Sequence, residues 1–346
     1  MSTWTDFLLR QGARLDAATS RVQAFGKAVE ETARSNFAVP LTHLGLIAAG
    51  GDEAAHFLHN QLTNDVEHLP ESCARIAGYC SAKGRLLADL LMWKERERIM
   101  LQLPREIQAG VQKRLQMYIL RAKVKLEDVS EQQAMIGLAG PAVACALMPW
   151  FPTLPVAIYD KVESEAGILI RHPNAYETPR YQWITANETA IAAWPQLSQV
   201  LQASGADAWE LAEIDSGVPH ITAATQEQFV PQMINFELIG GVNFKKGCYP
   251  GQEIVARSQY LGKLKRRMLR ASVASAAVAP GAELFSSADP GQPCGMVVNA
   301  ARIDGDEADC LVEIKLEAAD GEVRLGAADG PLLAFKTLPY PLTAPA

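Results

Sequence analysis

Residues 245–253 read Lys245-Lys246-Gly247-Cys248-Tyr249-Pro250-Gly251-Gln252-Glu253. Pro250 and Gly251 suit the central positions of a type II turn, because proline presets the first φ and glycine accepts the positive second one. A short helix can begin after the turn, with its positive end near the cysteine. This helix end and the two lysines, Lys245 and Lys246, favour the thiolate form of Cys248. The segment therefore predicts a reactive thiol, against the alternative of a small buried hydrophobe before a turn.

The same segment, extended to Arg257, resembles the signature of the YgfZ-type folate-binding proteins, which belong to the glycine-cleavage T-protein (aminomethyltransferase) superfamily. Four other segments agree with that family in order: Asn60-Gln61-Leu62-Thr63-Asn64-Asp65, Tyr79-Cys80-Ser81-Ala82-Lys83-Gly84-Arg85, Asp215-Ser216-Gly217-Val218-Pro219 and Phe229-Val230-Pro231-Gln232. The resemblance assigns these residues to the signature motif: Lys245, Lys246, Gly247, Cys248, Tyr249, Gly251, Gln252, Glu253 and Arg257. It implies a link to iron–sulfur cluster assembly or repair.

Length and charge set limits on the kind of protein this is. A chain of 346 residues usually forms two or three domains. The net charge of −7 argues against a nucleic-acid coat or a membrane-surface protein as a whole. No signal-peptide pattern opens the chain and no 18-residue apolar stretch occurs in it. We therefore expect a cytoplasmic protein without a membrane partner.

The six cysteines are scattered and none forms a C-x-x-C pair. The sequence thus predicts free thiols and no iron–sulfur cluster on this chain. His56 and His59 lie three residues apart, but no third metal ligand accompanies them, so we expect no metal site. A role in iron–sulfur chemistry would then consist of assisting other proteins, either client enzymes or assembly factors.

Hydrophobic periodicity and turn residues predict a mixture of helices and strands that alternate too unevenly for a doubly wound parallel sheet. The first 35 residues indicate one or two amphipathic helices. The pattern then predicts strands at 37–49, 73–81, 86–93, 97–103, 133–139, 156–171 and 180–186, and helices at 52–62, 105–120, 141–148, 187–203, 209–216 and 252–257. After residue 262, short strands between Pro-Gly and Asp-Gly turns indicate a small β-barrel.

The fold class is therefore α+β, and the resemblance arranges these elements into an aminomethyltransferase-like folate-binding fold. It implies an N-terminal extension at residues 1–35 and a discontinuous folate-binding domain at 36–130 and 205–262. A ferredoxin-like α+β domain is inserted at 131–204, and a C-terminal β-barrel occupies 263–346. We expect a monomer.

The resemblance also implies a tetrahydrofolate, or a one-carbon derivative of it, as the cofactor. A pterin ring needs hydrogen-bond acceptors and a flat apolar wall, and Asp215 and Trp209 can supply them. His43 falls at a folate-contacting position of the family, and Gln61 and Asn64 form a polar cluster, with Asp65, that can line the same cavity. Core packing for Trp209, a solvated or capping role for Asp215 and a capped turn for the cluster are the structural alternatives.

Asp89 is a carboxylate inside an apolar strand. It is the second candidate catalytic residue, in addition to Cys248. The aminomethyltransferases carry two adjacent aspartates here, whereas this chain has Ala88-Asp89. This departure weakens the case for aminomethyl transfer and leaves folate binding intact. An outward-facing strand carboxylate is the alternative.

Three functions follow, in decreasing order of support. The first is a tetrahydrofolate-binding accessory protein for iron–sulfur enzymes, with no turnover of its own. The second is a folate-dependent one-carbon transferase that uses Asp89. The third is a tRNA-modification factor that binds RNA through the basic segment at 263–270, where a solvated strand face or a site for an anionic folate tail are alternatives. RNA is the least expected partner.

Overall fold

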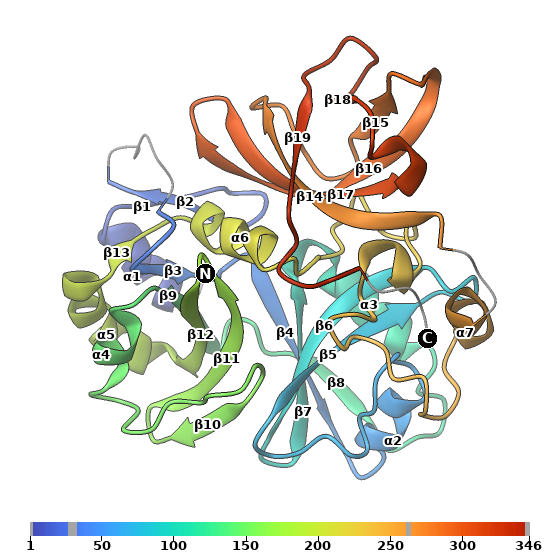
Figure 1. Ribbon diagram of the computed structural model, residues 1–346. Helices are drawn as coiled ribbons and strands as arrows, with labels where there is room; N and C mark the ends of the chain where they lie inside the picture. Colours follow the sequence, from blue (N-terminus) through green and yellow to red (C-terminus); the bar gives the residue numbers. More distant parts are fainter. Residues whose placement is uncertain (1–2, 27–32, 261–263, 343–346) are drawn as a thin grey trace. The chain divides into compact units, whose positions relative to one another are not determined.

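The computed structural model describes residues 3–26, 33–260 and 264–342 (Figure 1). The chain divides into two compact units. Unit 1 comprises Met1–Ala54, His68–Arg75 and Leu91–Ala212, and unit 2 comprises Ala55–Glu67, Ile76–Leu90 and Glu213–Ala346. Each unit is therefore discontinuous in sequence. The four-part domain division itself stays a prediction.

Unit 1 contains a six-stranded sheet with the order β10-β11-β12-β9-β3-β13. Its strands are β3 (Phe37–Pro40), β9 (Gln133–Ala139), β10 (Lys161–Ser164), β11 (Gly167–Ala175), β12 (Thr178–Ala186) and β13 (Gln202–Ala203). All neighbouring pairs are antiparallel except β13 with β3. Such a sheet is not doubly wound, in agreement with the α+β prediction.

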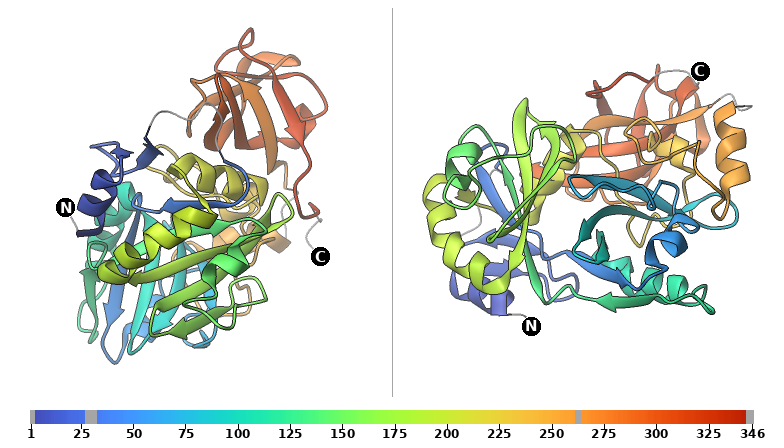
Figure 2. Two further views of the ribbon diagram at one scale, coloured as in Figure 1. Left: turned by 90° about the vertical axis from the view of Figure 1, so that its left-hand side faces the viewer. Right: turned by 90° about the horizontal axis from the view of Figure 1, so that it is seen from below.

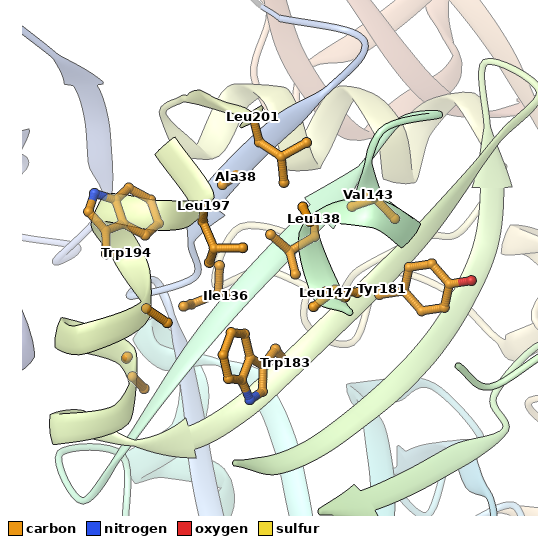
Figure 3. Close-up of a cluster of buried hydrophobic side chains, with 14 of the residues drawn as sticks. Ala38, Ile136, Leu138, Val143, Leu147, Tyr181, Trp183, Trp194, Leu197 and Leu201 are labelled. Carbon is orange, nitrogen blue, oxygen red and sulfur yellow. The ribbon is translucent and has the colours of Figure 1, made fainter. Parts of the chain in front are cut away.

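The core of this sheet is a cluster of buried aromatic and aliphatic side chains (Figure 3). Helix α5 (Asn187–Val200) places Ala190, Ala193, Trp194 and Leu197 on one face, because residues three and four apart share a side of a helix. Ile136 and Leu138 from β9 and Trp183 from β12 lie in the same cluster. Trp183 is fully buried, and its indole N–H donates to the carbonyl of Ala166 at 2.9 Å.

The N-terminal residues form one helix, α1 (Thr3–Arg10), followed by a hairpin of β1 (Ala13–Leu15) and β2 (Val22–Phe25). One helix is therefore present where the sequence predicted one or two, and a β-hairpin occupies the place of a second. The reason is turn chemistry: Oδ1 of Asp16 accepts hydrogen bonds from the backbone N–H groups of Ala18 and Thr19. Trp4, Phe7, Leu8 and Val22 pack into the core of unit 1.

A second sheet runs through strands β4 (Leu44–Gly50), β6 (Leu86–Glu95), β7 (Arg98–Pro104) and β8 (Lys125–Asp128) in the order β6-β7-β4-β8. The β6 residues that pair with β7 in unit 1 are 91–95. Helix α3 (Arg105–Gln116) follows β7 directly, and α4 (Val143–Leu147) follows β9. The amides of Gln102 in β7 and Gln182 in β12 hydrogen-bond to each other, so a polar contact links the two sheets inside unit 1.

Unit 2 carries residues 76–80 of β5 (Ala74–Cys80), residues 86–90 of β6, residues 55–59 of α2 (Ala54–His59), a 3-10 turn (Pro231–Ile234) and α7 (Gln252–Tyr260). Helix α6 (Ala206–Asp215) ends in this unit, and Gly217 adopts a positive φ of 68° after it, as predicted for a C-cap.

The C-terminal part of unit 2 is a curved six-stranded sheet with the order β18-β15-β16-β17-β14-β19, which Figure 2 shows from two further directions. Its strands are β14 (Arg266–Ala274), β15 (Glu283–Ser286), β16 (Asp289–Asp304), β17 (Glu307–Lys315), β18 (Val323–Leu325) and β19 (Leu333–Lys336). A bridge between Arg324 and Leu332 joins the two ends of the sheet. The sheet thus has the barrel-like form that the sequence predicted.

Replacing Trp183 by alanine tests the core of unit 1. We expect the free energy of unfolding to fall by about 3–5 kcal/mol, because the change removes a fully buried indole and leaves a cavity. Chemical denaturation followed by circular dichroism measures this loss. Val156→Ala is the control, since Val156 is 86% exposed and should change stability by less than about 0.5 kcal/mol. Equal midpoints for the two variants would contradict the assignment of this core.

Candidate functional site

The turn predicted at Pro250-Gly251 is present in unit 2. The N–H of Gln252 donates to the carbonyl of Tyr249 at 3.1 Å, and Gly251 has a φ of 79°, as a type II turn requires. A side chain at Gly251 would place its Cβ only 2.4 Å from the carbonyl oxygen of Ser81. The signature turn therefore packs backbone to backbone against the segment that contains Gly84, and α7 begins directly after it.

Cys248 is exposed beside this turn, whereas Tyr249 is buried and burial raises the pKa of its hydroxyl. Lys246 is half-buried, and its ammonium donates to the carbonyls of Leu62, at 2.8 Å, and of His59. The same ammonium lies 4.9 Å from the centre of the Tyr249 ring. Lys245 is exposed instead, so the two lysines of the signature have different environments.

The charge on Lys246 interacts with Cys248. Burial lowers the pKa of Lys246 to about 8, while attraction to Asp65, Cys248 and Glu67 acts in the opposite direction. The ammonium of Lys246 is thus anchored in place, and its pKa lies close to neutral pH. This arrangement gives the exposed thiol a fixed electropositive neighbour, which is the environment in which cysteines react.

The other cysteines differ from Cys248. Burial raises the pKa of the thiols of Cys80 and Cys310 to about 12, and it also raises that of Cys294. Of the six free cysteines, Cys248 and Cys145 are the exposed ones. Buried thiols with a raised pKa are poor nucleophiles, so a reactive cysteine is to be sought at Cys248, Cys145 or the half-buried Cys73.

The two histidines of α2 bind carboxylates. Nδ1 of His56 lies 2.7 Å from Oε1 of Glu67, and Nδ1 of His59 lies 3.1 Å from Oδ1 of Asp65. In residues 3–26, 33–260 and 264–342, no group of three or more His, Cys, Asp or Glu side chains is arranged to hold a metal ion.

The residues proposed for folate lie in both units. In unit 1, Trp209 is 2% exposed, and its ring packs against Gly137, the guanidinium of Arg180 at 4.8 Å and the ring of His172 at 5.1 Å. A Cβ at residue 137 would lie 2.4 Å from this indole, so glycine is required there. Within its unit, Trp209 is a tightly packed side chain.

His43 is also in unit 1, where its Nε2 lies 3.8 Å from Oε1 of Glu210. Arg21 from the N-terminal hairpin also binds Glu210, as well as Asp207 at 2.5 Å. Burial alone would lower the pKa of Arg21, but the two carboxylates raise it above its ordinary value. The N-terminal hairpin is thereby fastened to α6 close to Trp209.

In unit 2, Asp215 forms an ion pair with Arg270, with 2.6 Å between Oδ1 and Nη2. The side-chain N–H groups of Asn64 donate to the carbonyls of Ile76 and Gly240, both at 2.7 Å. These bonds give Asn64 a structural role. Oε1 of Gln61 is buried and has no hydrogen-bond partner among the described residues, so it could accept a ligand N–H.

The basic segment at 263–270 is largely neutralised in the described part of the chain. Arg266 binds Glu313 at 2.8 Å, Arg267 binds Glu237 at 2.5 Å, and Arg270 binds Asp215. Lys263 lies outside the described residues. Of the five cations in this segment, the structure places three in ion pairs.

Asp89 has a partner that the sequence did not suggest. Its Oδ2 lies 2.7 Å from Nδ1 of His220, and its Oδ1 accepts the N–H of Ile221 at 2.6 Å. Nε2 of His220 lies 3.9 Å from Oε2 of the buried Glu213, and Asn299 hydrogen-bonds both backbone groups of His220. Asp89 and Glu213 are nearly buried, while the His220 side chain is 32% exposed. No periodicity could have predicted this array, because its members come from β6, α6 and a loop.

The comparisons with known proteins agree with this geometry. The family model described as the GCVT N-terminal domain matches residues 17–157. The "tRNA-modifying protein YgfZ" of Photorhabdus laumondii subsp. laumondii is 32% identical over 319 residues, which are 89% of this chain and 95% of the relative. The chain belongs to the YgfZ family. Another YgfZ protein, from Colwellia psychrerythraea, is 29% identical over 89% of this chain and 94% of its own length.

The fold of this YgfZ-family chain is that of an aminomethyltransferase. The crystal structure of glycine cleavage system aminomethyltransferase T from Bartonella henselae matches it with a TM-score of 0.78 over 96% of each chain, at 17% identity. The family resemblance and the α+β fold predicted from the sequence are thus confirmed. No helix in the described residues is long and apolar enough to cross a membrane.

Lys246 makes a testable contribution to the pH dependence of stability. Its pKa is about 8 in the folded chain and near 10.5 in the unfolded chain. Between these values the unfolded state binds more protons, so the free energy of unfolding rises with pH. We expect Lys246→Met to lose this rise in denaturation experiments between pH 8 and 10. Lys245→Met, which removes an exposed charge from the same segment, is the control and should retain it; the same slope for wild type and Lys246→Met would refute the burial argument.

Proposed function

We propose that this chain binds a tetrahydrofolate and supports iron–sulfur enzymes that modify transfer RNA, with Cys248 as its reactive thiol. The relatives named as tRNA-modifying proteins supply the link to transfer RNA. The observation that carries the proposal is the exposed Cys248 beside the anchored ammonium of Lys246. We further propose that the protein acts in the cytoplasm as a monomer.

The thiol is suited to a transfer or exchange reaction with a partner protein. Cys248 is exposed next to the turn, and it interacts electrostatically with the anchored Lys246. Client enzymes or assembly factors would then meet Cys248 from solvent.

The proposed folate contacts suit a pterin in part. Gln61 offers a buried oxygen without a partner among the described residues, and Asp215 offers a carboxylate oriented by Arg270. Pterin N–H groups need acceptors of this kind. The family resemblance also proposes Trp209 and His43 as folate contacts, and both belong to unit 1. A bound folate would supply the one-carbon chemistry that the fold is associated with in the superfamily.

Cys248→Ser separates the two parts of the proposal. In a host strain whose own copy is deleted, we expect this variant to lower the level of a nucleoside made by an iron–sulfur tRNA-modifying enzyme to that of the deletion strain. The purified variant should bind tetrahydrofolate with wild-type affinity in calorimetry, because no proposed folate contact is changed.

Cys145→Ser is the matched control, since it removes the other exposed thiol and should restore the nucleoside to the wild-type level. Full activity of Cys248→Ser would reject the role of the thiol. A wild-type protein that does not bind tetrahydrofolate would reject the folate part.

A second candidate, a folate-dependent one-carbon transferase, is favoured by the Asp89–His220 pair. Asp89 is nearly buried and both of its oxygens accept hydrogen bonds, so it orients His220 and does not itself act as a free base. A neutral His220 that donates from Nδ1 keeps a lone pair on Nε2, which can take a proton, and its side chain is 32% exposed.

Turnover with purified protein decides between the two candidates. If the chain is a transferase, formation of methylene-tetrahydrofolate from an aminomethyl donor should fall by about 10²-fold or more in His220→Gln, as for loss of a general base. Asp89→Asn should lower the rate and shift its pH profile, since the imidazole loses its charged partner. Wild-type turnover that does not exceed background would remove the transferase candidate.

A further inference from the structure

One segment of unit 1 concentrates positive charge in a chain whose net charge is −7. Between Glu106 and Glu127 the sequence holds five cations and no acid: Lys113, Arg114, Arg121, Lys123 and Lys125. The segment comprises the end of α3, a loop and the start of β8. We call residues 113–125 the α3–β8 surface.

Most of these cations have no acid to neutralise them. Lys125 forms an ion pair with Glu127. In the described part of the chain, no ion pair involves the side chains of Lys113, Arg114, Arg121 or Lys123, whereas the arginines of the 263–270 segment are paired. Glu53 adds one negative charge here, since its Oε2 accepts the backbone N–H of Lys123 at 2.7 Å, so the cations of the segment still exceed the acids that contact it. The positive charge of the surface is therefore available to an external anion.

Three large apolar side chains are exposed among these cations. Tyr118 is 48% exposed, Met117 is 61% exposed and Leu120 is 90% exposed. Exposed side chains of this size usually mark a surface that contacts another molecule when they are grouped. Cations interleaved with an exposed aromatic ring are the combination with which proteins hold single-stranded nucleic acid, because phosphates bind the cations and bases stack on the ring.

The loop that presents these side chains is held at both ends. Before it, Ile107, Val111 and Leu115 bury one face of α3. Within it, the N–H of Tyr118 donates to the carbonyl of Leu115 at 3.0 Å, and the N–H of Ala122 donates to that of Ile119 at 2.8 Å. After it, the backbone of Lys123 packs so closely on Gly51 that a Cβ there would lie 2.1 Å from the Lys123 carbonyl oxygen. The surface is thus preorganised, which lowers the entropic cost of binding.

We propose that the α3–β8 surface binds RNA. Lys113, Arg121 and Lys123 contact phosphates, and a base of an unpaired segment stacks on Tyr118. The choice of RNA rests on the proposed link to transfer RNA, while the surface itself is independent of folate and of Cys248. An experiment that rejects RNA binding by this surface would therefore leave the proposed roles of folate and Cys248 untouched, and the reverse also holds.

The composition of the surface favours RNA over an anionic membrane. Stable attachment to a bilayer requires a continuous apolar face in addition to cations. Here the exposed apolar side chains are confined to one loop, and one of the three is a tyrosine. Acidic lipid remains a second arm of the test.

The test uses the full-length protein and a fluorescent 20-nucleotide single-stranded RNA of mixed sequence. The variant Lys113→Gln/Arg121→Gln/Lys123→Gln should bind more weakly, and the slope of log affinity against log salt should become shallower by about 2, or about 0.7 for each lost phosphate contact. Tyr118→Ala should weaken binding at least about fivefold through lost stacking, whereas Tyr118→Phe should bind as wild type does.

A matched variant controls for total charge. Arg10→Gln/Arg14→Gln/Arg96→Gln removes the same charge from exposed positions of unit 1 and should leave the affinity and salt slope near those of wild type. Wild-type binding by the α3–β8 triple variant, or an equal loss in the control, would overturn the proposal. So would wild-type protein that binds phosphatidylserine vesicles through this surface but does not bind the RNA.

Discussion

The signature segment depends on the anchoring of one ammonium group. Lys246 donates to carbonyls at and just beyond the C-terminal end of α2, where a helix leaves carbonyl groups without partners and carries partial negative charge. The half-buried lysine therefore satisfies groups that would otherwise need water. Tyr249 is buried as well, whereas Cys248, which lies between the two in sequence, is exposed. The exposed thiol therefore lies between two anchored neighbours.

Close backbone packing fixes the other side of the same segment. Gly251 and Gly84 approach so closely that a Cβ at Gly251 would lie 2.6 Å from the backbone of Gly84. Two stretches that the sequence resemblance identified separately are thus one structural feature. The Asp89–His220 pair depends on a similar principle, since a buried carboxylate is tolerated only when its oxygens are hydrogen-bonded. In both places, the groups proposed to function are held in position by contacts within the chain.

Local chemistry made much of this structure predictable. Pro250 and Gly251 determined the turn, and the spacing of Ile107, Val111 and Leu115 determined α3, because these signals lie within a few residues of each other. The partner of Asp89 was not predictable, since His220 is far from it in sequence. Charge along the chain was also misleading: the 263–270 segment forms ion pairs with distant carboxylates, while the cations of 113–125 have few acids near them. Sequence shows how many charges a segment has, but only the fold shows which are compensated.

The joined ends of the C-terminal sheet have a consequence for the behaviour of the protein at high concentration. Its outermost strands, β18 and β19, have three and four residues, and the bridge between Arg324 and Leu332 lies beside them. Strands with long unpaired edges can recruit strands from other molecules and start aggregates. The edge strands β18 and β19 are short and are bridged to each other, so they expose few unpaired backbone groups to which a strand of another molecule could bind. The sheet therefore limits intermolecular strand addition by its own geometry.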